Sequence, residues 1–343
     1  MSDKFRELLR KVGSGRHTGK DLTRAEAETA TMMILQQEAT PAQIGAFLIA
    51  HRIKRPTGIE LAGMMDAFDR LGSKLEPIAV DRPVVILSSP YDGRSRSAPI
   101  NQITALILAT AGCPVLMHGG DRTPTKHGIP SIEIWQGLGV NWQNLDLTQI
   151  HQVLSQNLLG FVYLPQHFPL AHDLVTYRDQ VGKRPPFATV ELIWSPYSGN
   201  AHTICGFVHP PTETMMREAF ALRGVKNFTT VKGSEGSCDI PRDRTAIIGV
   251  GEERLIVSAH DYGFAGQEFP LVETELVADI LAVLAGKASE LIRSAIWNGG
   301  FYLWHCGISP DLTAGIAEAE QLLLSGQVMQ KLVELRSATQ CYI

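Results

Sequence analysis

The chain of 343 residues contains few cysteines, and they form no recognisable pair. The five cysteines lie at positions 113, 205, 238, 306 and 341, without a C-x-x-C spacing. An odd, scattered set argues against a disulfide framework and against a cysteine zinc site. The sequence also lacks an apolar leader at its start and any run of about 18 apolar residues, the length that a membrane span needs. We therefore expect a reduced, cytoplasmic protein without a membrane span.

An excess of one charge is missing as well, because 31 basic residues face 35 acidic ones and the net charge is −4. That balance argues against a globally basic nucleic-acid binder, although it is compatible with a local basic patch. Hydrophobic residues make up 44% of the chain and charged residues 19%, so the chain can bury a core and is not disordered as a whole. Its length suits one large domain or two unequal ones.

Several catalytic motifs are absent from the sequence. There is no G-x-G-x-x-G after a strand, no Walker loop, no G-x-S-x-G elbow and no H-E-x-x-H. These absences disfavour ordinary dinucleotide enzymes, nucleotide triphosphatases, esterases and zinc peptidases.

The N-terminal part of the chain has the pattern of a small helical unit. Apolar residues recur at helical spacing from Phe5 onwards. Thr23 and Glu26 have the spacing of a capping box, and Thr40 before a proline is typical of a helix start. A further helix is expected over residues 58–71. The apolar faces of these helices need one another or a second subunit.

From residue 83 the pattern changes to that of a parallel α/β domain. The apolar run 84–87 predicts a buried strand, and a second strand is expected at 114–117, each followed by a polar loop. Further strands are expected at 160–164, 203–208, 228–231 and 254–257, before C-terminal helices over 273–335. The predicted fold class is α/β, with a small N-terminal helical domain (1–75) and a larger α/β domain (76–343) that has a mostly parallel sheet and flanking helices. Ligands bind where loops leave the carboxyl ends of such strands.

Residues 20–68, and most specifically the run EATPAQIGAFLIAHRIK at 38–54, resemble the N-terminal helical domain of the anthranilate phosphoribosyltransferase family. Residues 161–187 and 314–335 resemble that family's acceptor segment and last helix. The resemblance implies a cleft between the two domains and a homodimer formed through the helical domain, to which some later helices also belong. It also implies transfer of phosphoribosyl from phosphoribosyl pyrophosphate to the amine of anthranilate, a step of tryptophan biosynthesis assisted by magnesium.

The family's phosphate loop, G-T-G-G-D-G, corresponds to residues 88–93 here, and only Asp92 and Gly93 are retained. Loss of the glycines and gain of a proline remove backbone freedom and one N–H group that could wrap a phosphate. Arg94 and Arg96, each followed by a serine, could bind phosphate by another route. The alternative is that these arginines solvate a surface loop.

The family's K-H-G-N-R motif corresponds to a stretch that keeps His118, Gly119 and Arg122 but has Met117 in place of the lysine. Lys126 lies a few residues later and offers a replacement cation. The resemblance places these residues around phosphate. A structural role for His118 is the alternative.

The acceptor motif is better preserved, because Arg178, Arg184 and Phe187 match it, although its asparagine is replaced by Ala188. The resemblance implies that Arg178 binds the anthranilate carboxylate, for which a bidentate guanidinium is suited. The alternative is that Arg178 belongs to a structural ion pair.

The family's metal motif, H-G-x-x-G-L-D-E, corresponds to residues 232–239. Its glycines persist, whereas Lys232 replaces the histidine and Cys238 replaces the first carboxylate. Asp239 remains and Glu235 is a substitute, so the resemblance implies a magnesium site with these two ligands at most.

Three functions follow from these patterns. The first is a phosphoribosyltransferase with altered phosphate recognition and weak or changed activity. The second is a catalytically inactive family member that binds nucleic acid, because residues 1–24 carry a net charge of +4 and a second basic cluster follows. The basic residues concerned are Lys4, Arg6, Arg10, Lys11, Arg16, Lys20, Arg24, Arg52, Lys54 and Arg55. A merely solvated basic face is the alternative to that role, and a nucleoside phosphorylase is the third and weakest reading.

Overall fold

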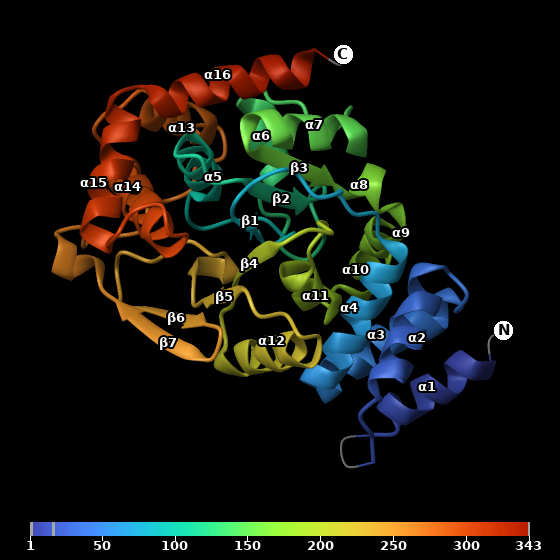
Figure 1. The fold of residues 1–343 in the computed structure, drawn as a ribbon. Coiled ribbons are helices and arrows are strands. Elements are labelled where there is room, and N and C mark those ends of the chain that lie inside the picture. The colour runs from blue at the N-terminus through green and yellow to red at the C-terminus, as the bar shows by residue number, and fades with distance from the viewer. Residues whose placement is uncertain (1–2, 16–17, 342–343) are drawn as a thin grey trace.

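A computed structural model describes residues 3–15 and 18–341, and its N-terminal part is the expected helical unit (Figure 1). The four helices are α1 (Asp3–Gly13), α2 (Arg24–Leu35), α3 (Pro41–Lys54) and α4 (Gly58–Leu71). Thr23 forms the predicted capping box, and Thr40 is the predicted N-cap and also forms a capping box; in both, the threonine hydroxyl accepts from the backbone N–H three residues later. α1 packs on α3 and α2 packs on α4.

One seven-stranded sheet forms the centre of the larger domain, in the order β3-β2-β1-β4-β5-β6-β7. Its strands are β1 (Val84–Leu87), β2 (Val115–Gly119), β3 (Leu159–Tyr163), β4 (Ala201–Gly206), β5 (Phe228–Val231), β6 (Ala246–Val250) and β7 (Glu253–Val257). The pairs from β3 to β5 are parallel, with Val85 opposite both Val115 and His202, while β6 and β7 add an antiparallel hairpin. The predicted fold class is confirmed, and β6 is the strand that the sequence pattern missed.

Helices cover both faces of this sheet (Figure 1). They are α5 (Asn101–Thr110), α6 (Ser131–Gly137), α7 (Leu147–Asn157), α8 (Leu164–His167), α9 (Pro169–His172), α10 (Leu174–Val181), α11 (Phe187–Ile193), α12 (Pro210–Leu222), α13 (Leu276–Leu284), α14 (Glu290–His305), α15 (Leu312–Leu324) and α16 (Gln327–Gln340). Two short 3₁₀ turns, η1 (Ser234–Gly236) and η2 (Ala259–Tyr262), follow β5 and β7. None of the helices within 3–15 and 18–341 is long and apolar enough to cross a bilayer.

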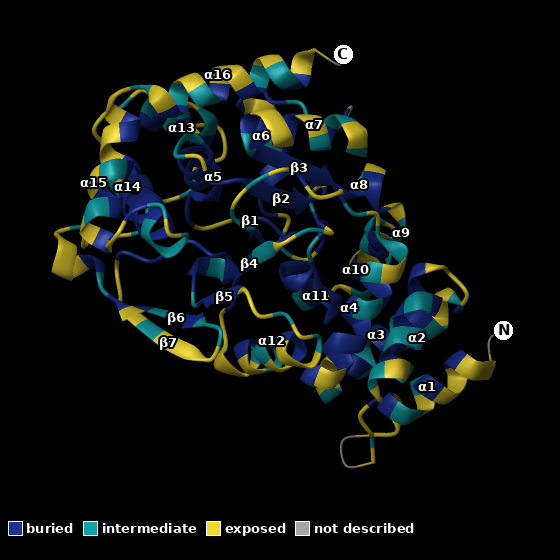
Figure 2. Ribbon diagram, in the orientation of Figure 1, coloured by how far each residue is buried: buried dark blue, intermediate teal, exposed yellow. Residues whose placement is uncertain are grey.

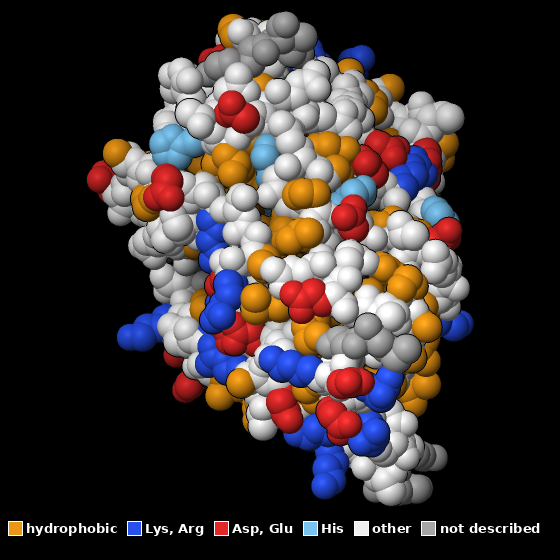
Figure 3. All heavy atoms as spheres, turned by 90° about the vertical axis from the view of Figure 1, so that its right-hand side faces the viewer, with side chains coloured by type: hydrophobic (Ala, Val, Ile, Leu, Met, Phe, Trp, Pro, Cys, Tyr) orange, Lys and Arg blue, Asp and Glu red, His pale blue; other side chains and the backbone are white. Residues whose placement is uncertain are grey.

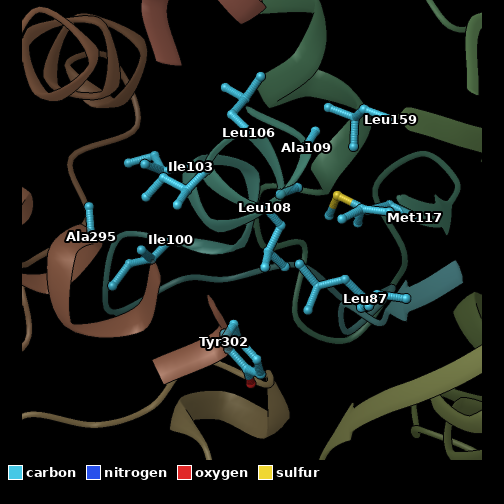
Figure 4. Close-up of a cluster of buried hydrophobic side chains, with 14 of the residues drawn as sticks. Leu87, Ile100, Ile103, Leu106, Leu108, Ala109, Met117, Leu159, Ala295 and Tyr302 are labelled. Carbon is cyan, nitrogen blue, oxygen red and sulfur yellow. The ribbon is translucent and has the colours of Figure 1, made fainter. Parts of the chain in front are cut away.

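Two hydrophobic cores hold the molecule together (Figure 2). The first lies between the sheet, α5 and the C-terminal helices, and its members include Ile103, Leu106 and Leu108 of α5 together with Leu87, Met117 and Tyr302 (Figure 4). The second joins α1–α4 to helices from α8 to α12. Within it the ring of Phe68 lies 5.2 Å from Phe168 and 5.9 Å from Trp194. The helical lobe is therefore packed against the segments that follow β3 and β4.

Three loops leave the carboxyl edge of the parallel strands: 88–100 after β1, 120–130 after β2 and 232–245 after β5. The first two are tied together by a short antiparallel bridge. The Arg94 N–H donates to the Ile129 carbonyl at 3.1 Å, and the Ile129 N–H donates back at 2.8 Å. The fold thereby brings the motifs of the sequence to one edge of the sheet.

Candidate active site

Arg94 lies at the centre of these loops, and only 5% of its side chain is exposed. One terminal nitrogen, Nη1, donates to Asp239 at 2.6 Å and to Ser237 at 2.8 Å. Nη2 donates to Ser97, and Nε donates to Glu235 at 3.2 Å. Arg94 therefore cross-links the loops after β1 and β5 and does not solvate a surface loop.

Glu235 occupies a ring of donors formed by the loop after β1. Its Oε1 accepts from the backbone N–H groups of Arg96 at 3.1 Å and of Ser95 and Ser97 at 3.4 Å. Its Oε2 accepts from Lys126 at 2.5 Å and from the Ser95 hydroxyl at 3.1 Å. Burial alone would raise the pKa of Glu235, but the bonds from Lys126 and the Arg96 N–H and the charge of Arg94 hold it at about 2. Glu235 is therefore a carboxylate at neutral pH.

The two expected magnesium ligands are both engaged by the same guanidinium. Arg94 lies between Glu235 and Asp239, and Asp239 also accepts from the Ile100 N–H at 3.4 Å. Over the described residues, no group of three or more His, Cys, Asp or Glu side chains is arranged so that it could hold a metal ion. A divalent cation would have to displace Arg94, so this donor set in its present arrangement does not fit magnesium. The magnesium expectation stays a prediction of the resemblance.

Some of the other residues expected to contact phosphate lie in the cluster around Arg94, and others lie outside it. Lys126 bonds both Glu235 and the Gly93 carbonyl, the latter at 2.7 Å. The side chain of Arg96 is 79% exposed, with Nε 3.8 Å from Glu235. Arg122 instead bonds Glu133 at 2.7 Å and Glu273 at 2.8 Å, outside the cluster. Arg94 and Lys126 are thus brought together, whereas Arg122 is held elsewhere.

The acceptor-side residues meet the same loop through Asp92. The Asp92 carboxylate lies 3.1 Å from Nε of Arg184 and 3.9 Å from Nη1 of Arg178. Nη2 of Arg178 bonds Glu191 of α11, while its Nε and Nη1 have no hydrogen-bond partner among the described residues. Burial lowers the pKa of Arg178 to about 10, against the opposing charge of Asp92, so it remains a cation at neutral pH. Arg178 is both part of a buried ion pair and a source of unused donors.

His118 is a buried residue of β2 and not the start of an open loop. Its Nδ1 lies 2.5 Å from the Tyr91 hydroxyl, and its ring packs edge-on against Trp194 at 5.8 Å. The next residue, Gly119, ends the strand. Burial lowers the pKa of His118 to about 3, so the imidazole is neutral at pH 7. In this arrangement His118 supports the loop through Tyr91.

The low pKa of His118 predicts an acid sensitivity. The unfolded chain gains a proton near the ordinary value of 6.5 while the folded one does not, so stability falls as the pH drops from 6.5 towards 3. At pH 4.5 this residue alone should lower the free energy of unfolding by on the order of 2 kcal/mol. Thermal melts of the wild type and of His118→Asn between pH 7 and 4.5 measure the effect. The variant should melt lower at pH 7 but lose less on acidification; equal slopes would contradict the assignment.

Little empty space remains around Arg94. A cavity of about 20 Å³ lies on its Phe269 side, and one of about 10 Å³ on its Asn101 side. Each has room for about one water molecule, whereas small-molecule sites usually offer several hundred Å³. The cluster is a closed arrangement, and a phosphorylated ligand can enter it only if a side chain leaves.

Some residues of the site had no signal in the sequence. Ser237, which bonds Arg94, lies within residues 232–239 but was not itself a candidate. Glu191, which bonds Arg178, and Trp194, which packs on His118, were not candidates either. An acidic residue in an otherwise apolar helix segment, as Glu191 is in α11, was the one available hint.

Five of the nine described basic residues named in the sequence analysis are paired with acidic ones. The pairs are Arg6–Asp3, Arg10–Glu7, Lys11–Glu26, Arg24–Asp66, Lys54–Asp21 and Lys54–Glu60. Arg16 lies outside the described residues. Acidic and basic side chains alternate over the lower part of the face in Figure 3, so these contacts do not support a continuous basic groove.

Comparison with known proteins agrees with this architecture over nearly its whole length. Two proteins named anthranilate phosphoribosyltransferase, from Afipia carboxidovorans and Alkalilimnicola ehrlichii, are 29% and 26% identical to the chain. The first alignment covers 98% of both chains, and the second covers 92% of this chain and 94% of that protein. The solved structure of the enzyme from Saccharomyces cerevisiae with phosphoribosyl pyrophosphate and magnesium matches with a TM-score of 0.85 and 16% identity, covering 99% of each chain. The enzyme from Thermus thermophilus matches with a TM-score of 0.80 and 18% identity, covering 99% of this chain and all of that one.

Two family models match the two parts of the fold. The helical bundle domain of a glycosyl transferase family matches residues 6–72, and the a/b domain of that family matches residues 93–329. The first range spans most of α1 and all of α2 to α4, and the second contains the strands from β2 to β7 and the helices from α5 to α15. The chain therefore belongs to this glycosyl transferase family.

Proposed function

We propose that this protein transfers a phosphoribosyl group from phosphoribosyl pyrophosphate to an aromatic amine that carries a carboxylate, such as anthranilate. The proposal rests on the loop after β1, because residues of that loop contact two groups of charged side chains. Asp92 of that loop contacts Arg178 and Arg184, and Arg94 a few residues later joins the cluster with Lys126. An anion-binding half and an acceptor half are thus built on the same segment.

The chemistry needs both halves. The bond from the ribose carbon to the pyrophosphate oxygen breaks, the amine nitrogen forms a new bond to that carbon, and the amine loses a proton. Negative charge grows on the leaving pyrophosphate, and cations or backbone N–H groups fixed in a buried place stabilise it best. Arg94, Lys126 and the N–H groups of residues 95–97 are the donors that this chain offers.

The acceptor half supplies orientation. Nη1 of Arg178 has no hydrogen-bond partner among the described residues, so it can donate to a carboxylate that the guanidinium charge attracts. Glu191 accepts from Nη2 and limits rotation of the group. Magnesium accompanies phosphoribosyl pyrophosphate in the similar yeast structure. In this chain Glu235 and Asp239 would be the residues to hold it, but Arg94 engages both.

Arg178 provides the test of this proposal. Loss of anthranilate fluorescence in the presence of phosphoribosyl pyrophosphate and magnesium reports transfer, and we expect slow turnover by the wild type because the site is closed. Arg178→Lys keeps the charge but not the planar guanidinium and its fixed donor positions, so the KM for anthranilate should rise about tenfold or more while kcat changes less. Aniline, which lacks the carboxylate, should be used equally poorly by both proteins.

Arg223→Lys is the matched control, because Arg223 is also a mostly buried arginine paired with acids, but it lies at the end of α12 and its partners Asp66 and Asp69 lie on α4. Its KM for anthranilate should equal that of the wild type. Absence of any transfer by the wild type at millimolar substrate would rule the proposal out.

We also propose a homodimer and a cytoplasmic location. A groove of about 1140 Å³ runs along α1 and α3 and is lined by small and apolar side chains, among them Ala46, Ile49 and Ile53. Ile53 is 70% exposed, which is unusual for so large an apolar side chain and supports contact with a second copy. All five cysteines are free thiols, which agrees with a reducing compartment. The paired basic residues give no support to a nucleic-acid partner.

A further inference from the structure

The Glu235 carboxylate is held by the kinds of donors that usually bind an external anion. Three consecutive backbone N–H groups, those of residues 95–97, converge on one carboxylate, and such runs of N–H groups form anion-binding concavities in many proteins. A hydroxyl, an ammonium and a guanidinium complete the ring, from Ser95, Lys126 and Arg94. The side chain of Glu235 is only 3% exposed. A structural salt bridge needs one cation, whereas this carboxylate takes donors from every side.

We propose that the N–H groups of residues 95–97, together with Arg94 and Lys126, form a binding site for a phosphate dianion, which Glu235 occupies as an internal anion and vacates when a phosphorylated ligand binds. The inference rests on the function proposed above, since it concerns the same site. It assigns to Glu235 the role of a competitor and not that of a metal ligand. The ligand class is the terminal phosphate or pyrophosphate group of a small molecule.

The charges of the site match that ligand. With Glu235 in place, two carboxylates face the three cations Arg94, Arg96 and Lys126. With Glu235 removed, Asp239 alone opposes them, and the remaining charge of about +2 balances the charge of about −2 that a phosphate monoester carries at neutral pH. A phosphate also has more acceptor oxygens than a carboxylate, so it can satisfy the same donors.

The backbone of Glu235 is suited to release. Its φ and ψ are 54° and 20°, a left-handed conformation that costs a residue with a Cβ about 1 kcal/mol. Glu235 lies in the 3₁₀ turn η1, between Gly233 and Gly236, and Gly236 has a φ of 81°. Departure of Glu235 from the donor ring would relieve this strain, and the glycines allow the turn to move.

Protonation does not open the site at neutral pH. The pKa of Glu235 is about 2, so the carboxylate stays charged and leaves only when another anion competes for its donors. Lys126, Arg94, Arg96 and Asp239 are the charged groups that face it. Occupancy should therefore depend on ligand concentration and ionic strength more than on pH between 5 and 8.

Titration calorimetry of the full chain with inorganic pyrophosphate tests the proposal. Glu235→Gly removes the carboxylate at a position whose backbone conformation favours glycine, and its Kd for pyrophosphate should be at least about tenfold lower than that of the wild type. Glu235→Gln keeps the size of the side chain but not its charge, and it should shift in the same direction, which covers the case in which the glycine variant does not fold. The further substitution Lys126→Met in either Glu235 variant should abolish this gain in affinity for pyrophosphate.

Glu213→Gln is the matched control. Glu213 is likewise buried and bonded to a cation, Arg254, and to Thr230, but it lies on α12 beside β5 and β6. Its affinity for pyrophosphate should equal that of the wild type. A folded Glu235 variant with an unchanged Kd would overturn the proposal.

These experiments distinguish failure of the anion-site proposal from failure of the proposed function. Tighter pyrophosphate binding by the Glu235 variants without transfer to anthranilate would leave the anion site intact and remove the transferase. Transfer by the wild type with no change in pyrophosphate affinity in the variants would retain the transferase and remove the internal competitor.

Discussion

Replacing Arg94 with methionine is expected to lower the free energy of unfolding by about 3–5 kcal/mol, because removal of one partner leaves buried charges uncompensated. Arg94 is the cation shared by Glu235 and Asp239, and both carboxylates are nearly as buried as the guanidinium. Methionine has a similar length, so the change removes charge and donors more than volume. Ser97 and Ser237 also lose their donor.

Thermal and urea unfolding of Arg94→Met and Arg96→Met would measure this effect. Arg96 lies two residues away in the same loop, but its side chain is 79% exposed. Its replacement should change the free energy of unfolding by no more than about 0.5 kcal/mol. Equal melting temperatures for the two variants would show that the cluster around Arg94 contributes no net stability.

Gly93→Ala is expected to be the second most damaging change, and to disturb the site as well. Gly93 has a φ of +71°, and a Cβ there would lie 2.3 Å from the Gly128 carbonyl oxygen. The obstacle is backbone that is itself fixed, because the Ile129 carbonyl next to it accepts from the Arg94 N–H. The two loops must separate, so we expect a loss of about 2–3 kcal/mol beyond the cost of the left-handed conformation, as for other overpacked positions.

Gly182→Ala isolates the conformational part of that loss. Gly182 has a φ of +62° at the end of α10, and a Cβ there would meet nothing within 4 Å. Its replacement should cost about 1 kcal/mol, the ordinary price of a left-handed alanine. Denaturant midpoints of the two variants, measured together, give the difference; a loss for Gly93→Ala no larger than that for Gly182→Ala would contradict the predicted clash.

Local patterns were enough to predict most elements of the fold. Thr23 and Thr40 cap the starts of their helices in the structure as expected, because a cap needs only residues within one helical turn. The apolar run 84–87 is β1, since a strand buried on both faces requires such a run. Strand β6 was missed because its short run contains Gly249 and its pairing with β5 and β7 lies beyond a local window.

The composition of the site was predicted, but its internal contacts were not. Arg94, Lys126, Glu235 and Asp239 were all candidates in the sequence, and they do meet at one place. Their roles depend on which partners they reach. Glu235, expected near a metal, lies in a ring of N–H donors, and Arg122 is held away from the cluster by Glu133.

The amino-acid sequence alone was sufficient for the family, the two-part architecture and the set of charged residues near the carboxyl edge of the sheet. These features follow from local periodicity, caps and motif spacing. The tertiary structure decided that Arg94 is buried while Arg96 in the same loop is exposed, and that one guanidinium engages both expected metal ligands. The physical reason is that burial and charge pairing arise between loops more than 130 residues apart in the chain, and no local pattern records which of two neighbouring side chains will face the other loop.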